Sequence, residues 1–205
     1  MRNLIMATVL VLSVLYDAPV QAQTAGIPCS GPVWWAKSEA TFADFDFWEG
    51  KWMVFDRASG LMVGFDTIEK GLQGCVLIQH WQHLNDIYTT PGTAFRMEGR
   101  SHTALGADGK WHQVWVANNG SYLPLSGGLQ EDGSMVLETD WIEFNDRQGT
   151  LRRSKHRWHW QPMANGNIHN WGFNKQGDGE WTQYFDIEYR RNVPGGPTAN
   201  LNEPQ

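Results

Sequence analysis

Glutamine side chains alternate with indole rings in two segments of the sequence, and this alternation indicates a small-molecule site. Gln79 precedes Trp81 by two residues, and Gln113 lies midway between Trp111 and Trp115. Residues two apart on a strand face the same side, so each segment presents an amide beside indole rings, the usual composition of a ligand pocket. The candidate ligand-binding residues are Gln79, Trp81, Trp111, Gln113, Trp115, Trp171 and Tyr184.

A second group of side chains could transfer protons in the same site. His159, His169 and Asp186 are candidates for a general base or acid, and Arg157 could stabilise a developing anion. On strands, Arg157 shares a face with His159, and Asp186 shares one with Tyr184. Two structural alternatives stay open: the tryptophans and glutamines form a satisfied core, and Arg157 with Asp186 forms an ordinary cross-strand pair.

Other chemistries find little support. The sequence has no nucleophile elbow, P-loop or Rossmann glycine motif. His80 and His83 form an H-x-x-H pattern, as do His156 and His159, but strand residues three apart point to opposite faces. Neither pair can therefore chelate one ion by itself. We expect no metal and no cofactor; a zinc or haem site built from histidines of different strands is the alternative.

The elements that would position these residues are short strands. Asp-Gly and Asn-Gly dipeptides, which favour hairpin turns, recur at 108–109, 119–120, 132–133, 165–166 and 178–179, and Ser-Gly stands at 59–60. Hydrophobic residues between them repeat every second position, which indicates about ten strands. Several strands are apolar on both faces, which favours a closed sheet. The sequence therefore predicts an all-β, antiparallel, up-and-down barrel.

In the last long strand we assign residues to two faces. One face would carry Trp181, Gln183, Phe185, Ile187 and Tyr189. The other face would carry Thr182, Tyr184, Asp186, Glu188 and Arg190.

The two ends differ in composition from the middle of the chain. Arg2 precedes a run of about a dozen apolar residues, shorter than the roughly 20 that span a bilayer, and residues 20–22 read Val-Gln-Ala. This is typical of a cleaved signal peptide over 1–22, with an uncleaved anchor as the alternative. We expect an N-terminal arm over 23–42, the barrel over 43–191 and a disordered tail over 192–205. The protein would then be periplasmic or secreted.

Cys29 and Cys75 are the only cysteines of the 205-residue chain. In an exported protein an even number of cysteines favours a disulfide. Two free thiols or a catalytic cysteine are the alternatives, although no activating base stands beside Cys75 in the sequence.

Composition narrows the range of partners. The formal net charge is −6, which argues against nucleic acid or anionic lipid. The 12 tryptophans indicate a thick aromatic core, an aromatic-lined cavity, or both. The expected partner is a small hydrophobic or aromatic molecule.

The chain also resembles the DUF1579-like family of exported bacterial proteins over residues 29–191. The motifs that carry the resemblance are 45–52 (FDFWEGKW), Gly74-Cys75, Trp81, 111–116 (WHQVWV), 160–162 (WQP), Phe185-Asp186 and 189–191 (YRR). The resemblance implies a calycin-like (lipocalin-like) barrel, and a pairing of Cys29 with Cys75 fits its pattern. Gln79 replaces a frequent Glu, and 168–170 (IHN) replaces a frequent Val-Arg-Gln. If these positions face the cavity, a charged pair has become a neutral Gln and a His.

Three functions follow, in order of preference. The first is an exported barrel that binds a small hydrophobic or aromatic molecule in its cavity. The second is a cofactor-free lyase, isomerase or cyclase that acts on an aromatic or unsaturated molecule in the same cavity. The third is a structural envelope protein with a filled barrel. A cluster of His159, His169 and Asp186 inside a pocket would favour the enzyme, and an open cavity without it would favour binding.

Overall fold

The structure is a computed structural model that describes Cys29, residues 40–84 and residues 96–191. The predicted signal peptide, the tail and most of the N-terminal arm lie outside these residues. None of the helices in the described ranges is long and apolar enough to cross a membrane.

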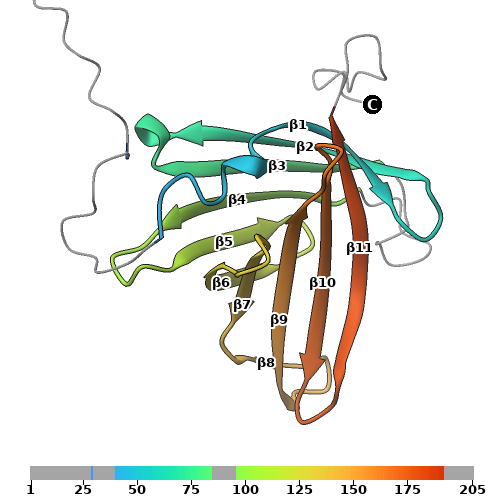
Figure 1. Ribbon diagram of the computed structural model, residues 1–205. Helices are drawn as coiled ribbons and strands as arrows, with labels where there is room; N and C mark the ends of the chain where they lie inside the picture. The colour runs from blue at the N-terminus through green and yellow to red at the C-terminus, as the bar shows by residue number, and fades with distance from the viewer. Residues whose placement is uncertain (1–28, 30–39, 85–95, 192–205) are drawn as a thin grey trace, which may run out of the picture.

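The described residues form a closed antiparallel barrel of ten strands with one further strand beside it (Figure 1). The strands are β1 (Gly50–Asp56), β2 (Met62–Gly71), β3 (Val76–His83), β4 (Glu98–Leu105), β5 (Trp111–Ala117), β6 (Tyr122–Leu129), β7 (Met135–Thr139), β8 (Ile142–Asn145), β9 (Leu151–Pro162), β10 (Ile168–Gln176) and β11 (Trp181–Arg191). Sequential neighbours pair from β1 to β7, and the sheet closes through β7–β9, β9–β10, β10–β11 and β11–β1. The predicted calycin-like, up-and-down barrel is confirmed.

β9 is long enough to have two different neighbours on one side. Its second half pairs with β7, with Met135 opposite Trp160, and its first half pairs with β8, with Ile142 opposite Ser154. β8 therefore lies outside the ring, beside the ends of β9–β11 that extend downward in Figure 1.

The predicted turn dipeptides connect the strands with one shift. Glycines with positive φ stand at 60, 109, 120, 133 and 166, as the hairpin signals predict. In the β10–β11 hairpin the positive φ of 52° belongs to Gly177 instead of Gly179. A further turn at Gly149 separates β8 from β9. It was not predicted, because Gln148 precedes this glycine in place of Asp or Asn.

A short 3-10 helix, η1 (Asp46–Trp48), packs aromatic rings against the inside of the barrel. The Phe45 ring lies 5.0 Å from that of Trp48, 5.7 Å from Trp111 and 5.2 Å from Trp160. The Trp52 indole N–H donates to the Trp48 carbonyl at 2.9 Å. These fully buried rings fill one part of the barrel interior and leave the rest available for a cavity.

A β-bulge in β11 changes which side chains face inward. Gly172 pairs with Phe185 and Phe173 pairs with Gln183, so Tyr184 is an extra residue without a partner in the ladder. Phe185, Ile187 and Tyr189 share one face, as predicted, and this face is the inner one; the bulge turns Tyr184 inward as well. The prediction that Trp181 and Gln183 share a face with Phe185 is wrong, because the bulge reverses the alternation and the Trp181 ring lies 4.3 Å from the Arg157 guanidinium on the outer surface.

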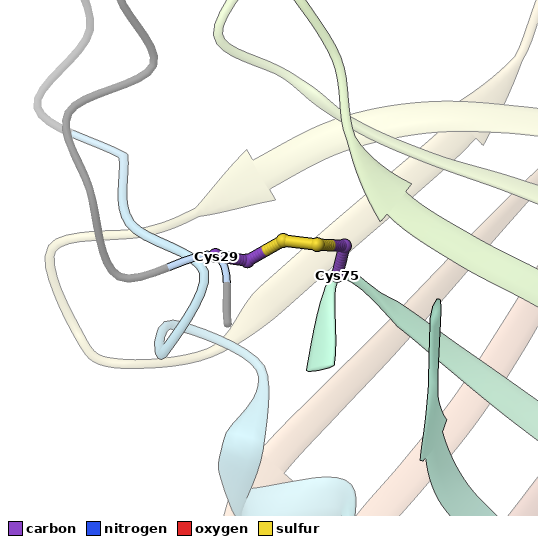
Figure 2. The surroundings of a disulfide bond; sticks show 2 residues. All are labelled: Cys29 and Cys75. Atoms are coloured by element: carbon purple, nitrogen blue, oxygen red, sulfur yellow. A yellow bond between two sulfur atoms is a disulfide. The ribbon is translucent and has the colours of Figure 1, made fainter. Parts of the chain in front are cut away.

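Cys29 and Cys75 form the predicted disulfide (Figure 2). Their Cα atoms are 5.2 Å apart, within the normal range for such bonds. The bond joins residues 46 positions apart and holds the chain before η1 against the start of β3. The alternatives of free thiols and a catalytic cysteine are thereby excluded for this structure.

Candidate functional site

The barrel encloses an open cavity of about 550 Å³, a volume typical of small-molecule sites. Its apolar wall consists mainly of Trp81, Trp115, Trp158, Trp160, Phe185 and Ile187. β3, β5, β9 and β11 supply these residues from their buried faces, because alternate residues of each strand point into the barrel.

Trp158 is the centre of the aromatic wall. Its ring makes edge-to-face contacts with Trp115 at 5.8 Å, Trp160 at 6.0 Å and Phe185 at 5.8 Å. Edge-to-face pairs are favourable arrangements of aromatic quadrupoles. The contacts fix the indole rings of the wall in place, so the cavity is preformed.

A buried polar network crosses the barrel behind part of this wall. The Gln79 amide donates to Asp66 at 2.6 Å and accepts from Ser101 at 2.7 Å, and the Tyr189 hydroxyl donates to Asp66 at 2.9 Å. Gln113 extends the network by donating to Ser101 at 3.1 Å. Gln79 and Tyr189 line the cavity, so the network connects the cavity wall to a buried carboxyl group.

Asp66 is the unusual member of this network. It is 1% exposed, and burial raises its pKa from 3.8 to about 7, against the opposing hydrogen bonds from Gln79 and Tyr189. Burial also raises the pKa of the Tyr189 hydroxyl. The Oδ1 atom of Asp66 has no hydrogen-bond partner among the described residues. The carboxyl group is therefore neutral over much of the acidic range.

A second polar group lies where the β11 bulge meets β9. The Trp158 indole N–H donates to the Tyr184 hydroxyl oxygen, and the His156 ring packs edge-to-face on Tyr184 at 5.7 Å. Burial lowers the pKa of His156, so the imidazole is neutral at neutral pH, and burial raises the pKa of Tyr184. Neutral hydrogen-bonding groups therefore line this part of the cavity.

The predicted ligand-binding residues fall into three groups. Gln79, Trp81, Trp115 and Tyr184 line the cavity. Trp111 and Gln113 are buried inside the barrel without lining it, since Trp111 packs on Phe45 and Gln113 bonds to Ser101 and Thr103. These two belong to the packed core, as the structural alternative expects, although Trp111 Nε1 and Gln113 Oε1 have no hydrogen-bond partner among the described residues. Trp171 lies on the outer surface, so the expectation that it faces the cavity is wrong.

The four predicted catalytic residues also lie outside the cavity. In β9 and β10 the even-numbered residues are the buried ones, so Arg157, His159 and His169 point outward, where Asp186 of β11 joins them. The expectation that they converge inside the barrel is wrong. Gln79 lines the cavity and His169 lies outside it, so these two positions do not form a pair inside the cavity.

On the outer surface three of these residues, His159, His169 and Asp186, form a cluster with Trp171 and Arg57. Trp171 lies between His159 and His169, at ring distances of 4.8 Å and 4.1 Å. The His169 Nε2 atom is 2.7 Å from Asp186 Oδ1 and 2.8 Å from Nη1 of Arg57. One nitrogen cannot donate to a carboxylate and accept from a guanidinium at once, so the tautomer selects one of these bonds. Burial and the charge of Arg157 lower the pKa of His159.

Arg157 is engaged elsewhere on that surface. Its Nε atom donates to Glu138 at 2.6 Å, and its guanidinium covers the Trp181 ring. The suggested Arg157–Asp186 pair therefore does not form, because each partner has another ion pair. The cluster is a set of mutually paired surface groups.

Sequence reasoning missed several cavity residues, among them His156, Trp158, Trp160, Asn170 and Tyr189. A signal for the first three was present, since Trp158 and Trp160 share a strand face with His156. Asp66 carried no such signal: Gln79 comes from the next strand, but Tyr189 is 123 residues away in the sequence.

The two H-x-x-H pairs behave as strand geometry predicts. His83 is buried while His80 is on the outer side, bonded to Glu98 at 2.6 Å, and His156 and His159 also lie on opposite faces. The described part of the chain brings together no group of three or more potential metal ligands.

Comparison with models of known protein families and with curated proteins gives no match. Membership of the DUF1579-like family therefore stays a prediction from motifs.

Proposed function

We propose that this protein is an exported carrier or receptor that binds a small hydrophobic or aromatic molecule inside its barrel. The observation that carries the proposal is the preformed cavity of about 550 Å³ with walls of indole and phenyl rings. A barrel that served only as a structural element would be expected to fill its interior with side chains.

The position of the titratable groups supports binding over catalysis. The candidates for proton transfer, His159, His169 and Asp186, lie on the outer surface, where no wall excludes water from a substrate. Asp66 has a raised pKa, but it lies behind Gln79 and Tyr189 and does not itself line the cavity. No charged side chain among the described residues lines the cavity to activate a substrate.

Export rests on two independent features. The first 22 residues have the pattern of a cleaved leader. The Cys29–Cys75 disulfide is of the kind that persists in oxidising compartments. A periplasmic or secreted carrier is consistent with both.

The test is native mass spectrometry of the protein purified from the exported fraction, followed by titration with a library of aromatic compounds. A matched pair of variants reports on the cavity. Ser121→Phe introduces a ring at a position that lines it, whereas Ser126→Phe introduces the same ring opposite the exposed His112. We expect Ser121→Phe to weaken binding and Ser126→Phe to leave it unchanged. If no compound binds the wild-type protein, or if both variants bind equally well, the proposal is wrong.

A further inference from the structure

The cavity offers no charge to a ligand. None of the described aspartate, glutamate, lysine or arginine side chains lines it, and burial lowers the pKa of His156, its one imidazole. A charged ligand would lose its hydration without gaining a counter-ion, which is strongly unfavourable. The chemistry of the wall therefore selects a neutral guest.

Most polar groups in the wall already have partners. Gln79 donates to Asp66 and accepts from Ser101, and Tyr189 donates to Asp66. Asn170 donates one of its two N–H groups to the carbonyl of His159, which leaves the second N–H and the acceptor oxygen. These groups hold the barrel together and have few hydrogen-bond donors left for a guest.

The remaining donors differ in their accessibility. The indole N–H groups of Trp81 and Trp160 have no partner among the described residues, but both nitrogens are covered from solvent. Ser121 adjoins the exposed Asn119 at the rim. Tyr184, in contrast, lines the cavity and is 36% exposed.

The Tyr184 hydroxyl has one free function, its proton. Its oxygen accepts the N–H of Trp158, and no described residue accepts the hydroxyl proton in return. A phenol carries one donor and two lone pairs, so the group is poised to donate. An N–H bond into the oxygen polarises the O–H group and strengthens that donation.

The backbone of β11 is built to place this hydroxyl. Without the extra residue at Tyr184, strict alternation would put its side chain on the outer surface with Asp186. Bulges commonly redirect one side chain next to a functional site. Here the bulge places the Tyr184 phenol in the cavity wall, beside Trp158 and His156.

We propose that the ligand is a neutral aromatic compound with a carbonyl or similar acceptor oxygen, and that this oxygen accepts the Tyr184 hydroxyl proton. Tyr184 is then the residue that distinguishes such a compound from a hydrocarbon of the same shape. This inference rests on the proposed binding function and adds the chemical class of the ligand.

Three probes of nearly equal shape test the inference: 2-acetylnaphthalene, 2-isopropylnaphthalene and 2-naphthoate. Binding is measured by quenching of tryptophan fluorescence for the wild type, Tyr184→Phe and the control Tyr122→Phe, whose side chain is 60% exposed. We expect the wild type to bind the ketone about ten-fold more tightly than the hydrocarbon, the effect of one hydrogen bond. Tyr184→Phe should abolish this preference, and Tyr122→Phe should keep it. The naphthoate should bind most weakly.

A spectroscopic measurement separates a direct hydrogen bond from a structural role of Tyr184. The infrared carbonyl stretch of bound, 13C-labelled ketone should lie at lower frequency in the wild type than in Tyr184→Phe. Equal affinity for ketone and hydrocarbon, an unshifted carbonyl band, or tightest binding of the naphthoate would overturn the inference while leaving the binding function intact. Failure of all three probes to bind would overturn both.

Discussion

The buried carboxyl group of Asp66 should make the stability of the protein fall as the pH rises. In the unfolded chain Asp66 loses its proton near its ordinary pKa of 3.8, whereas in the folded protein it keeps the proton up to about pH 7. Between these values the folded state binds more protons than the unfolded state, so the free energy of unfolding decreases with pH. The contribution is fully present below about pH 4 and is lost by about pH 7.

The size of this effect follows from the two pKa values. Each pKa unit corresponds to about 1.4 kcal/mol, so raising the pKa from 3.8 to about 7 gives a total loss of about 4 kcal/mol. Roughly a third of this loss has already occurred when the pH reaches 5. A loss of about 3 kcal/mol in the free energy of unfolding therefore remains between pH 5 and pH 9. Asp66 is fully buried, so solvent screening does not reduce the effect.

Substitution of Asp66 by Asn isolates this contribution. The asparagine oxygen can accept the bonds from Gln79 and Tyr189 and never ionises. The free energy of unfolding is measured for both proteins by urea denaturation with tryptophan fluorescence. The value for Asp66→Asn minus the value for the wild type should be about 3 kcal/mol larger at pH 9 than at pH 5. Titrations elsewhere in the chain are common to both proteins and cancel in the difference.

Asp132 provides the matched control. Hydrogen bonds from Ser134 lower the pKa of its carboxyl group, so Asp132 is ionised in both states throughout this pH range. Asp132→Asn should therefore change the free energy of unfolding by the same amount at pH 5 and pH 9. If Asp66→Asn is equally independent of pH, then Asp66 is not held neutral by burial and the argument fails.

Three further predictions concern the fold itself. Reducing the disulfide should lower the free energy of unfolding by up to about 4 kcal/mol, the loop-closure value for 46 residues, as urea denaturation with and without reductant would show. Phe45→Ala should lower it by about 3–5 kcal/mol, because the ring is fully buried among tryptophans; an unchanged denaturation midpoint would show that η1 does not help to close the barrel. Gly127→Ala should lower the melting temperature while Gly128→Ala does not, because a Cβ at 127 would overlap with the Val136 carbonyl and one at 128 meets open space; equal melting temperatures would contradict this.

The barrel was predictable because turn chemistry and alternation agree along most of the chain. In 76–83 and 111–117 the buried residues are those that alternation selects, such as Gln79 and Trp115. These strands have one aromatic face and one face of mixed polarity, so the inner face is easily identified. The disulfide was predictable from the cysteine count together with the predicted signal peptide.

The inner face of β10 could not be predicted by counting hydrophobic residues. Trp171 and Phe173 point outward, while Asn170 and Gly172 point into the barrel. The inner position of Gly172 is needed because a Cβ there would overlap with the Phe185 ring. The space beside Gly172 is thus filled by Phe185 of the neighbouring strand β11. The sequence of β10 alone therefore cannot indicate that Gly172 faces the barrel interior.

The wrong assignment in β11 and the proposed ligand donor have one cause. Alternation through 181–191 assumes an unbroken ladder, and the extra residue at Tyr184 breaks it. A bulge disrupts the hydrogen-bond ladder locally, and bulges are common beside functional sites, where they redirect a side chain. At this position the redirected group is a hydroxyl, placed beside Trp158 in a cavity that otherwise offers few donors. Departures from regular alternation are expected where function, rather than stability, selects the residue, and the role that we propose for Tyr184 accounts for this departure.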